Sequence, residues 1–246
     1  QVYVSSENDA MIPLFQNDGT NVFNPAFAEP NVLIVNTEKL DELGITVEGY
    51  ADLLQPELKG KIIAADPANS SSAFQSLIGM LYGMGNGDPM SDEAWNFIDE
   101  FLVNLDGKVA SSSSQVYNGV ASGEYCVGLS YEDPCVELQA AGEYPVKVVY
   151  AKEGTIFSGQ SIQIVKDAPH LEAAQKFVDY VLSEKVQTAV AAELNLRPLR
   201  SGIPVNDKMI PNEDIKLFDT YSAAYIAENK PEIVNTYLEH VEMMME

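Results

Sequence analysis

Residues 59–85 read KGKIIAADPANSSSAFQSLIGMLYGMG, and this stretch decides the fold class. Ile62–Ala65 is a short apolar run with β-branched residues, which predicts a buried strand. The polar cluster at 69–72 supplies side-chain oxygens that cap helices, and apolar residues recur at helical spacing from Phe74 onward. The stretch therefore predicts a strand that leads through a serine-rich turn into an amphipathic helix.

The rest of the chain repeats this alternation. Further strands are predicted from short apolar runs at 31–37, 125–131, 145–151 and 161–165. Helices are predicted from capping residues and helical spacing at 37–45, 91–105, 112–123, 132–142, 171–183, 184–195, 214–229 and 231–245. A polar helix is expected just before Lys59, whereas residues 1–30 read as an irregular surface segment. The alternation implies right-handed βαβ crossovers and an α/β fold with a mostly parallel sheet.

Composition and charge bound the class of protein. The chain has 246 residues, 46% of them hydrophobic, which allows one large domain or two small ones. Its 14 Lys and Arg against 37 Asp and Glu give a formal charge of −23, so nucleic acids and anionic membrane surfaces are repelled. A small anionic ligand is compatible with this charge, because helix N-termini and backbone amides create local fields that a distant, screened charge does not cancel.

Processing signals and catalytic patterns are scarce. The sequence has no apolar run of membrane-spanning length and no basic-then-apolar start typical of a signal peptide, although export signals are removed on maturation. Cys126 and Cys135 are too few for a disulfide scaffold, and a bridge between them stays open. Metal-ligand, Walker, dinucleotide and GxSxG patterns are absent from the sequence. No enzyme activity, metal or cofactor is predicted.

Two polar clusters follow predicted strands and open predicted helices. They consist of Asn69, Ser70, Ser71 and Ser72, and of Ser111, Ser112, Ser113 and Ser114. In an open α/β sheet, ligands bind at the carboxyl ends of the strands, and helix N-termini there attract phosphate or carboxylate without any lysine. Either cluster alone is more often a set of helix caps. Two clusters at equivalent positions favour recognition of an anion or of hydroxyl groups.

Other polar side chains are candidates for the same site. Tyr131 ends the strand at 125–131 and Glu132 follows it, and a phenol beside a carboxylate suits sugar hydroxyls or ammonium groups. The alternative is a half-buried core tyrosine and a solvated loop acid. Glu153 is a weaker candidate. Arg197 and Arg200 are able to clamp a ligand acid, although arginines that satisfy helix-end carbonyls or pair with surface acids are commoner.

Several long stretches, in order, resemble a known family. They are VLIVNTEKLDELGI (32–45), YADLLQPELKGKIIAADPANSSSAF (50–74), SSSSQVYNGVASGEYCVGLSYEDP (111–134) and GQSIQIVKDAPHLEAAQKFVDYVLSEKVQTAVAAELNLRPLR (159–200). With them the chain resembles the iron, phosphonate and sugar-phosphate branch of ABC-importer solute-binding proteins. The resemblance covers nearly the whole chain. It implies a type II periplasmic-binding-protein fold with two lobes that close around a ligand by a hinge.

The resemblance also implies a division of the chain. Residues 1–45 and 156–246 are expected to form the remainder of lobe one, with hinge strands and C-terminal helices, and residues 46–155 to form the βαβ ligand-binding lobe. Members of the family usually begin with a segment that makes the first strands and helices of lobe one. On this resemblance, the opening part of lobe one is expected to be missing and half of the usual ligand cleft to be incomplete.

The expected ligand follows from the same comparison. Ferric-binding relatives use two adjacent tyrosines after the strand that matches 125–131, whereas here Tyr131 is followed by Glu132, which disfavours iron. Relatives that bind aminoethylphosphonate or hexose phosphate are similar in their serine-rich helix openings. A phosphorylated sugar or related organophosphate is therefore expected, with its phosphate on the serine clusters and its polar body against Tyr131, Glu132 and Glu153. A ferric-iron binder and a non-transport interaction domain are the alternatives.

The resemblance finally implies partners and a compartment. The expected partners are a small anionic solute and the permease of an ABC importer, and no nucleic acid. The expected location is extracytoplasmic, either in the periplasm or at a lipoprotein-anchored cell surface. The protein is expected to be a monomer.

Overall fold

A computed structural model describes residues 1–245. The chain forms two compact units. Unit 1 consists of Gln1–Glu29 and Phe157–Asp214, and unit 2 consists of Pro30–Ile156 and the residues from Ile215 onward. Among the described helices, none combines the length and the apolar character that crossing a bilayer requires.

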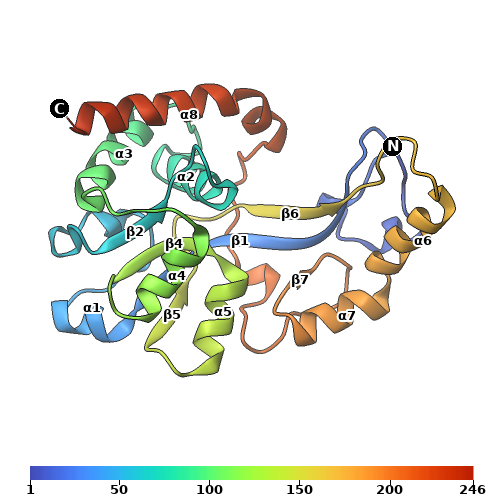
Figure 1. Ribbon diagram of the computed structural model, residues 1–246, viewed down its shortest axis with the longest axis horizontal. Coiled ribbons are helices and arrows are strands. Elements are labelled where there is room, and N and C mark those ends of the chain that lie inside the picture. Colours follow the sequence, from blue (N-terminus) through green and yellow to red (C-terminus); the bar gives the residue numbers. More distant parts are fainter. Residues whose placement is uncertain (246) are drawn as a thin grey trace. The chain divides into compact units, whose positions relative to one another are not determined.

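Unit 2 is built on a sheet whose strand order is β3-β2-β4-β1-β5 (Figure 1). Its strands are β1 (Asn24–Asn36), β2 (Ile62–Ala65), β3 (Val109–Ala110), β4 (Val127–Tyr131) and β5 (Val146–Val149). β2 runs parallel to β3 and β4, but β1 runs antiparallel to both β4 and β5. The prediction of a mostly parallel sheet is therefore wrong for β1, because this strand follows a segment of unit 1 and not a helical crossover of unit 2.

Helices cover the sheet of unit 2. They are α1 (Thr37–Leu43), α2 (Ser71–Met84), α3 (Asp92–Leu105), α4 (Ser113–Ala121), α5 (Glu132–Ala141) and α8 (Ala223–Met245). Figure 1 shows α8 lying along α3, and both helices contribute to the main apolar core. The polar helix expected before Lys59 is instead two short 3-10 turns, Ala51–Leu54 and Pro56–Leu58.

The C-terminal helix also differs from the sequence-based expectation. Two helices were expected, at 214–229 and 231–245, but α8 is continuous through Pro231 and begins only at Ala223. In the segment before α8, Leu217 forms an isolated β-bridge with Thr155. The backbone of this segment therefore makes its hydrogen bonds with Thr155 and not within a helix. Within α8, Pro231 removes one backbone hydrogen-bond donor. The helix is nevertheless unbroken, because the packing of α8 on the core outweighs the loss of that hydrogen bond.

Unit 1 contains β6 (Phe157–Ile162), β7 (Arg197–Pro198), α6 (Leu171–Leu182), α7 (Glu184–Glu193) and several 3-10 turns. β6 and β7 both pair with β1. The expectation that residues 1–30 are irregular is therefore wrong from Asn24 onward, where β1 begins and where Ala26 and Ala28 are buried. The prolines at both ends of this stretch disguise the strand, because proline is rare inside sheets.

The observed division into units differs from the sequence-based one at two places. Residues 30–45 belong to unit 2, because β1 pairs there with β4 and β5. The residues from Ile215 onward also belong to unit 2, because α8 packs on α3. Neither association is local in sequence. The two cysteines, Cys126 and Cys135, are both buried free thiols.

Candidate functional site

The carboxyl ends of four strands of unit 2 lie at one edge of its sheet. β3, β2 and β4 are parallel neighbours, and β5 points the same way as β4 because each is antiparallel to β1. The two polar clusters follow β3 and β2, whereas Tyr131 ends β4 and Tyr150 follows β5. This is the edge at which ligands bind in open α/β sheets.

The structure brings the two serine clusters into direct contact. The hydroxyl oxygens of Ser72 and Ser113 are 2.8 Å apart, and those of Ser70 and Ser72 are 3.1 Å apart. The hydroxyl of Ser70 lies 3.4 Å from that of Ser113. We call Ser70, Ser72 and Ser113 the serine edge. Each of these three residues is half-buried.

The other members of the clusters lie on the same two turns. Ser112 caps α4 by accepting a hydrogen bond from the amide of Gln115, and its hydroxyl is 3.1 Å from that of Ser114. Ser111 bonds to the side chain of Gln115, and Asn69 donates to Asp66. Ser71, in the first turn of α2, is exposed. The cluster residues Asn69, Ser111, Ser112 and Ser114 are exposed as well.

Helix capping and the serine edge are not exclusive. Ser70 accepts a hydrogen bond from the amide of Ala73 and thereby caps α2, while it also contacts the other two hydroxyls. The first turns of α2 and α4 contain no acidic residue. The N-termini of α2 and α4 thus present backbone amides and the positive ends of their helix dipoles at the serine edge. Neither helix has a carboxylate in its own first turn.

The next helix opening along the sheet has the opposite character. Tyr131 precedes α5, and Glu132 and Asp133 occupy its first turn. Glu132 is only 2% exposed and accepts a hydrogen bond from the hydroxyl of Tyr150. The ring of Tyr131 meets that of Tyr117 edge-on, with the ring centres 6.4 Å apart. Donors for an anion and acceptors for hydroxyl or ammonium groups therefore stand at neighbouring strand ends.

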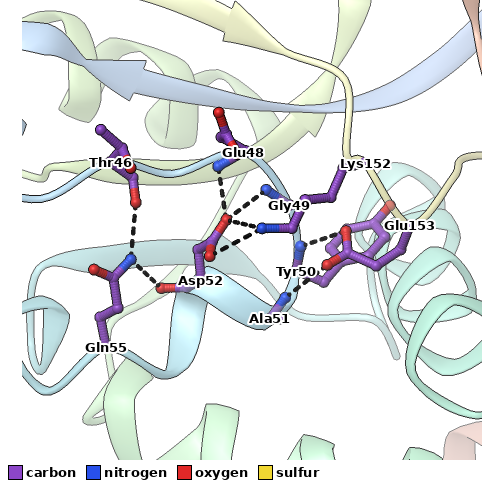
Figure 2. Close-up of polar contacts among 9 residues, drawn as sticks. All are labelled: Thr46, Glu48, Gly49, Tyr50, Ala51, Asp52, Gln55, Lys152 and Glu153. Atoms are coloured by element: carbon purple, nitrogen blue, oxygen red, sulfur yellow. Dashed lines mark hydrogen bonds and ion pairs between the residues drawn. The ribbon is translucent and has the colours of Figure 1, made fainter.

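Glu153 lies elsewhere and has a structural role. Its two carboxylate oxygens accept hydrogen bonds from the backbone amides of Tyr50 and Ala51, at 2.9 and 3.1 Å (Figure 2). Its Cβ lies beside Gly83, near the C-terminal end of α2. The serine edge is at the other end of that helix, about 18 Å away along its axis. Glu153 is therefore not brought together with the serine clusters.

A second carboxylate supports the same turn. Asp52 accepts hydrogen bonds from the backbone amides of Glu48 and Gly49, and it pairs with Lys152 at 2.9 Å (Figure 2). Burial by itself raises the pKa of Asp52, but these hydrogen bonds and the nearby ammonium group outweigh it, so the pKa is lowered overall. The turn at 48–52 is thus held by two acids that a sequence alone presents as surface charges.

The two arginines are also structural. Arg197 is fully buried in unit 1 and donates to the backbone oxygen of Ile210 and to the side chain of Asn212. Arg200 forms an ion pair with Glu7 at 2.6 Å. Over residues 1–245, no group of three or more His, Cys, Asp or Glu side chains lies close enough together to hold a metal ion.

Sequence reasoning missed two residues at this edge. Asn31 pairs in register with Tyr131, and Tyr150 bonds to Glu132. A parallel β1 would place Asn31 at the opposite edge, so the expected parallel sheet does not point to this residue. The signal for Tyr150 is its position near the end of the strand predicted at 145–151, comparable to that of Tyr131 at the end of the strand predicted at 125–131.

Comparisons with known proteins agree with this architecture. A family model for bacterial extracellular solute-binding proteins matches residues 3–229. The spermidine/putrescine-binding periplasmic protein of Escherichia coli is 31% identical over 185 residues, which cover 72% of this chain and 51% of that protein. The chain spans about half the length of the curated relatives it matches.

Solved structures extend the likeness to the whole fold. The periplasmic binding protein AfuA from Actinobacillus pleuropneumoniae, with fructose-6-phosphate bound, superposes with a TM-score of 0.83 over 98% of this chain and 76% of that chain, at 24% identity. A Bordetella ferric binding protein gives a TM-score of 0.70 over 98% of this chain and 76% of that chain, at 20% identity. Likeness at these identities confirms an α/β fold of the periplasmic-binding-protein kind.

Proposed function

The chain belongs to the family of bacterial extracellular solute-binding proteins, which bind and do not catalyse, and we propose that it binds a phosphorylated sugar or related organophosphate for an ABC importer. Its location is accordingly periplasmic or extracellular. The observation that carries the proposal is the contact between Ser72 and Ser113, which joins two helix N-termini from different strands. The permease of the importer is the partner that such a protein would serve.

The serine edge has the chemistry that a phosphate group requires. A phosphate presents several acceptor oxygens and a negative charge, and it is favoured by hydroxyl donors, backbone amides and helix N-termini. α2 and α4 supply all three around Ser70, Ser72 and Ser113. Because no acid lies in the first turns of these helices, an anion there meets no like charge from those turns.

The neighbouring strand end supports a position for the rest of the ligand. Tyr131 ends β4 and Glu132 follows it, and a carboxylate with a phenol favours sugar hydroxyls as donors and an apolar ring face as a surface. A hexose phosphate carries both a dianionic end and a polyol body. Its two ends therefore match the two kinds of helix opening at this edge.

Two other solutes are supported by specific observations. The E. coli relative is named for spermidine and putrescine, and a polyamine would favour Glu132 and the acidic first turn of α5. The Bordetella neighbour is named for ferric iron, and Tyr131 and Tyr150 are phenols that an iron site would use. The serine edge contains no acidic side chain with which a polyamine could pair. The organophosphate is preferred for this reason.

Titration calorimetry of the purified protein separates these ligands. The panel contains fructose-6-phosphate, inorganic phosphate, spermidine and ferric citrate. We expect the hexose phosphate to bind, and we expect Ser72→Ala and Ser113→Ala each to weaken it by about tenfold, the effect of losing one hydrogen bond to a charged group. Binding of spermidine alone, abolished by Glu132→Gln, would establish the polyamine alternative. A visible tyrosinate-to-iron absorption band would establish iron.

A matched control separates binding from helix capping. Ser91 caps α3 by accepting a hydrogen bond from the amide of Ala94 at 3.3 Å, the same geometry by which Ser70 caps α2. Ser70→Ala and Ser91→Ala should therefore lose similar stability, about 1 kcal/mol. Only Ser70→Ala should also weaken the hexose phosphate. Equal affinities for the two variants would contradict a ligand at the serine edge.

A further inference from the structure

Asn31 is a buried polar residue at the end of an otherwise apolar strand face. Leu33 and Val35 share its side of β1 and belong to the main core of unit 2. Asn31 itself is 3% exposed, so the chain buries an amide where the alternation would continue with an apolar side chain. Burial of an amide is unfavourable unless its hydrogen bonds are made, so the contacts of Asn31 define what it does.

The side-chain amide of Asn31 joins two separate segments. Its Nδ2 atom lies 3.1 Å from the backbone oxygen of Ser72 and 3.0 Å from the hydroxyl of Ser76, both in α2. The same atom lies 3.3 Å from the backbone oxygen of Ser130, the residue before Tyr131. One side chain thus ties the first turn of α2 to the end of β4.

Asn31 is itself anchored from the other side. Its backbone oxygen accepts a hydrogen bond at 2.9 Å from the hydroxyl of Thr155, which is 1% exposed. In the ladder between β1 and β4, its Cα is paired with that of Tyr131. The backbone of Asn31 is therefore fixed in position, and its side-chain amide contacts Ser72 and Ser130 from there.

We propose that Asn31 is a positioning residue that sets the separation between the serine edge and the Tyr131–Glu132 pair. Ser72 carries one of the hydroxyls of the serine edge, and Ser130 leads directly into the pair. A ligand that contacts both places depends on this separation, whereas a ligand that contacts only one does not. Asn31 thereby favours a phosphorylated polyol over inorganic phosphate. This role presupposes the solute site proposed above.

The test compares two variants and two probes. Asn104 is the matched control, because it is 7% exposed in the same unit and its amide likewise joins two backbone oxygens, those of Leu53 and Gln55, at 2.8 and 2.9 Å. By calorimetry, Asn31→Ala should weaken fructose-6-phosphate about tenfold and inorganic phosphate by less than about threefold. Asn104→Ala should change both by less than about twofold while losing similar stability in urea.

The outcomes separate this role from the proposed function. Equal weakening of both probes by Asn31→Ala, unchanged affinities, or an equal effect of Asn104→Ala would each overturn the positioning role. If the unaltered protein binds neither probe, the proposed function fails, and hydrogen exchange on the ligand-free protein then decides the role of Asn31. Faster exchange at 71–76 and 130–133 in Asn31→Ala alone supports it, and unchanged exchange there overturns it.

Discussion

A side chain at Gly49 is expected to be destabilising because of the carboxylate that faces this position. A Cβ at this position would lie 2.0 Å from one carboxylate oxygen of Glu153 and 2.7 Å from its carboxyl carbon, so the carboxylate would have to leave (Figure 2). It would then lose its hydrogen bonds to the amides of Tyr50 and Ala51. Two such bonds on a half-buried group contribute about 2–3 kcal/mol after allowance for solvent.

The net cost of Gly49→Ala follows from this loss and one gain. Replacing glycine where the backbone is not left-handed stabilises a protein by about 0.4–1 kcal/mol through the unfolded state. Gly49→Ala should therefore lower the free energy of unfolding by about 1–2 kcal/mol. In a Glu153→Ala background the obstacle is gone, and the same substitution should be neutral or stabilising. The coupling between the two positions should be about 2 kcal/mol.

Urea unfolding followed by tryptophan fluorescence measures this coupling. Trp95, the one tryptophan in the sequence, is buried in the core of unit 2 and reports on the unit that contains both positions. All four members of the double-mutant cycle are compared at neutral pH. A cost for Gly49→Ala that is the same with and without Glu153 would refute the reasoning, because the carboxylate would then not be what excludes a side chain.

Further predictions concern pH, thiol reactivity and the buried arginine. The pKa of Asp52 is lower in the folded protein than in the unfolded chain, so its ionised carboxylate contributes to stability. This contribution is complete above the unfolded pKa of about 3.9 and is lost as pH falls through the lower folded pKa. The stability difference between the protein and Asp52→Asn, measured in urea, should therefore shrink below about pH 4. Burial raises the pKa of Cys135 to about 12 and also raises that of Cys126, so a thiol reagent at pH 8 should label neither in the native protein and both in denaturant. Arg197→Met should lower the unfolding free energy, followed by circular dichroism, by about 2–4 kcal/mol, and Arg200→Met by clearly less, because Arg200 pairs nearer the surface.

The local order of strands and helices could be predicted from sequence, because it depends on local signals. The β-branched run Ile62–Ala65 predicts a strand and is β2, and the helix after it begins within the predicted capping cluster at 69–72, with Ser70 as its N-cap. The meeting of Ser72 and Ser113 followed from two such turns after neighbouring strands. These features needed only the rule that parallel strands end at one edge.

The remaining features depend on contacts that are distant in sequence. The direction of β1 is set by its pairing with β4, about a hundred residues later, and this direction places Asn31 opposite Tyr131. Glu153 reads as a free acid in sequence, yet it caps a turn that lies about a hundred residues earlier. Periodicity carries no information about either partner.

The packing of α8 has a consequence for how the protein matures. Ile226, Ile233 and Tyr237 from this last helix fill the apolar interior of unit 2, and unit 1 likewise needs residues 157–214 to complete the sheet that its opening segment begins. During synthesis, unit 1 is therefore unable to close before residue 214 has left the ribosome, and unit 2 is unable to close before α8 has done so. A nascent chain that has not yet reached α8 is therefore open and accessible to chaperones.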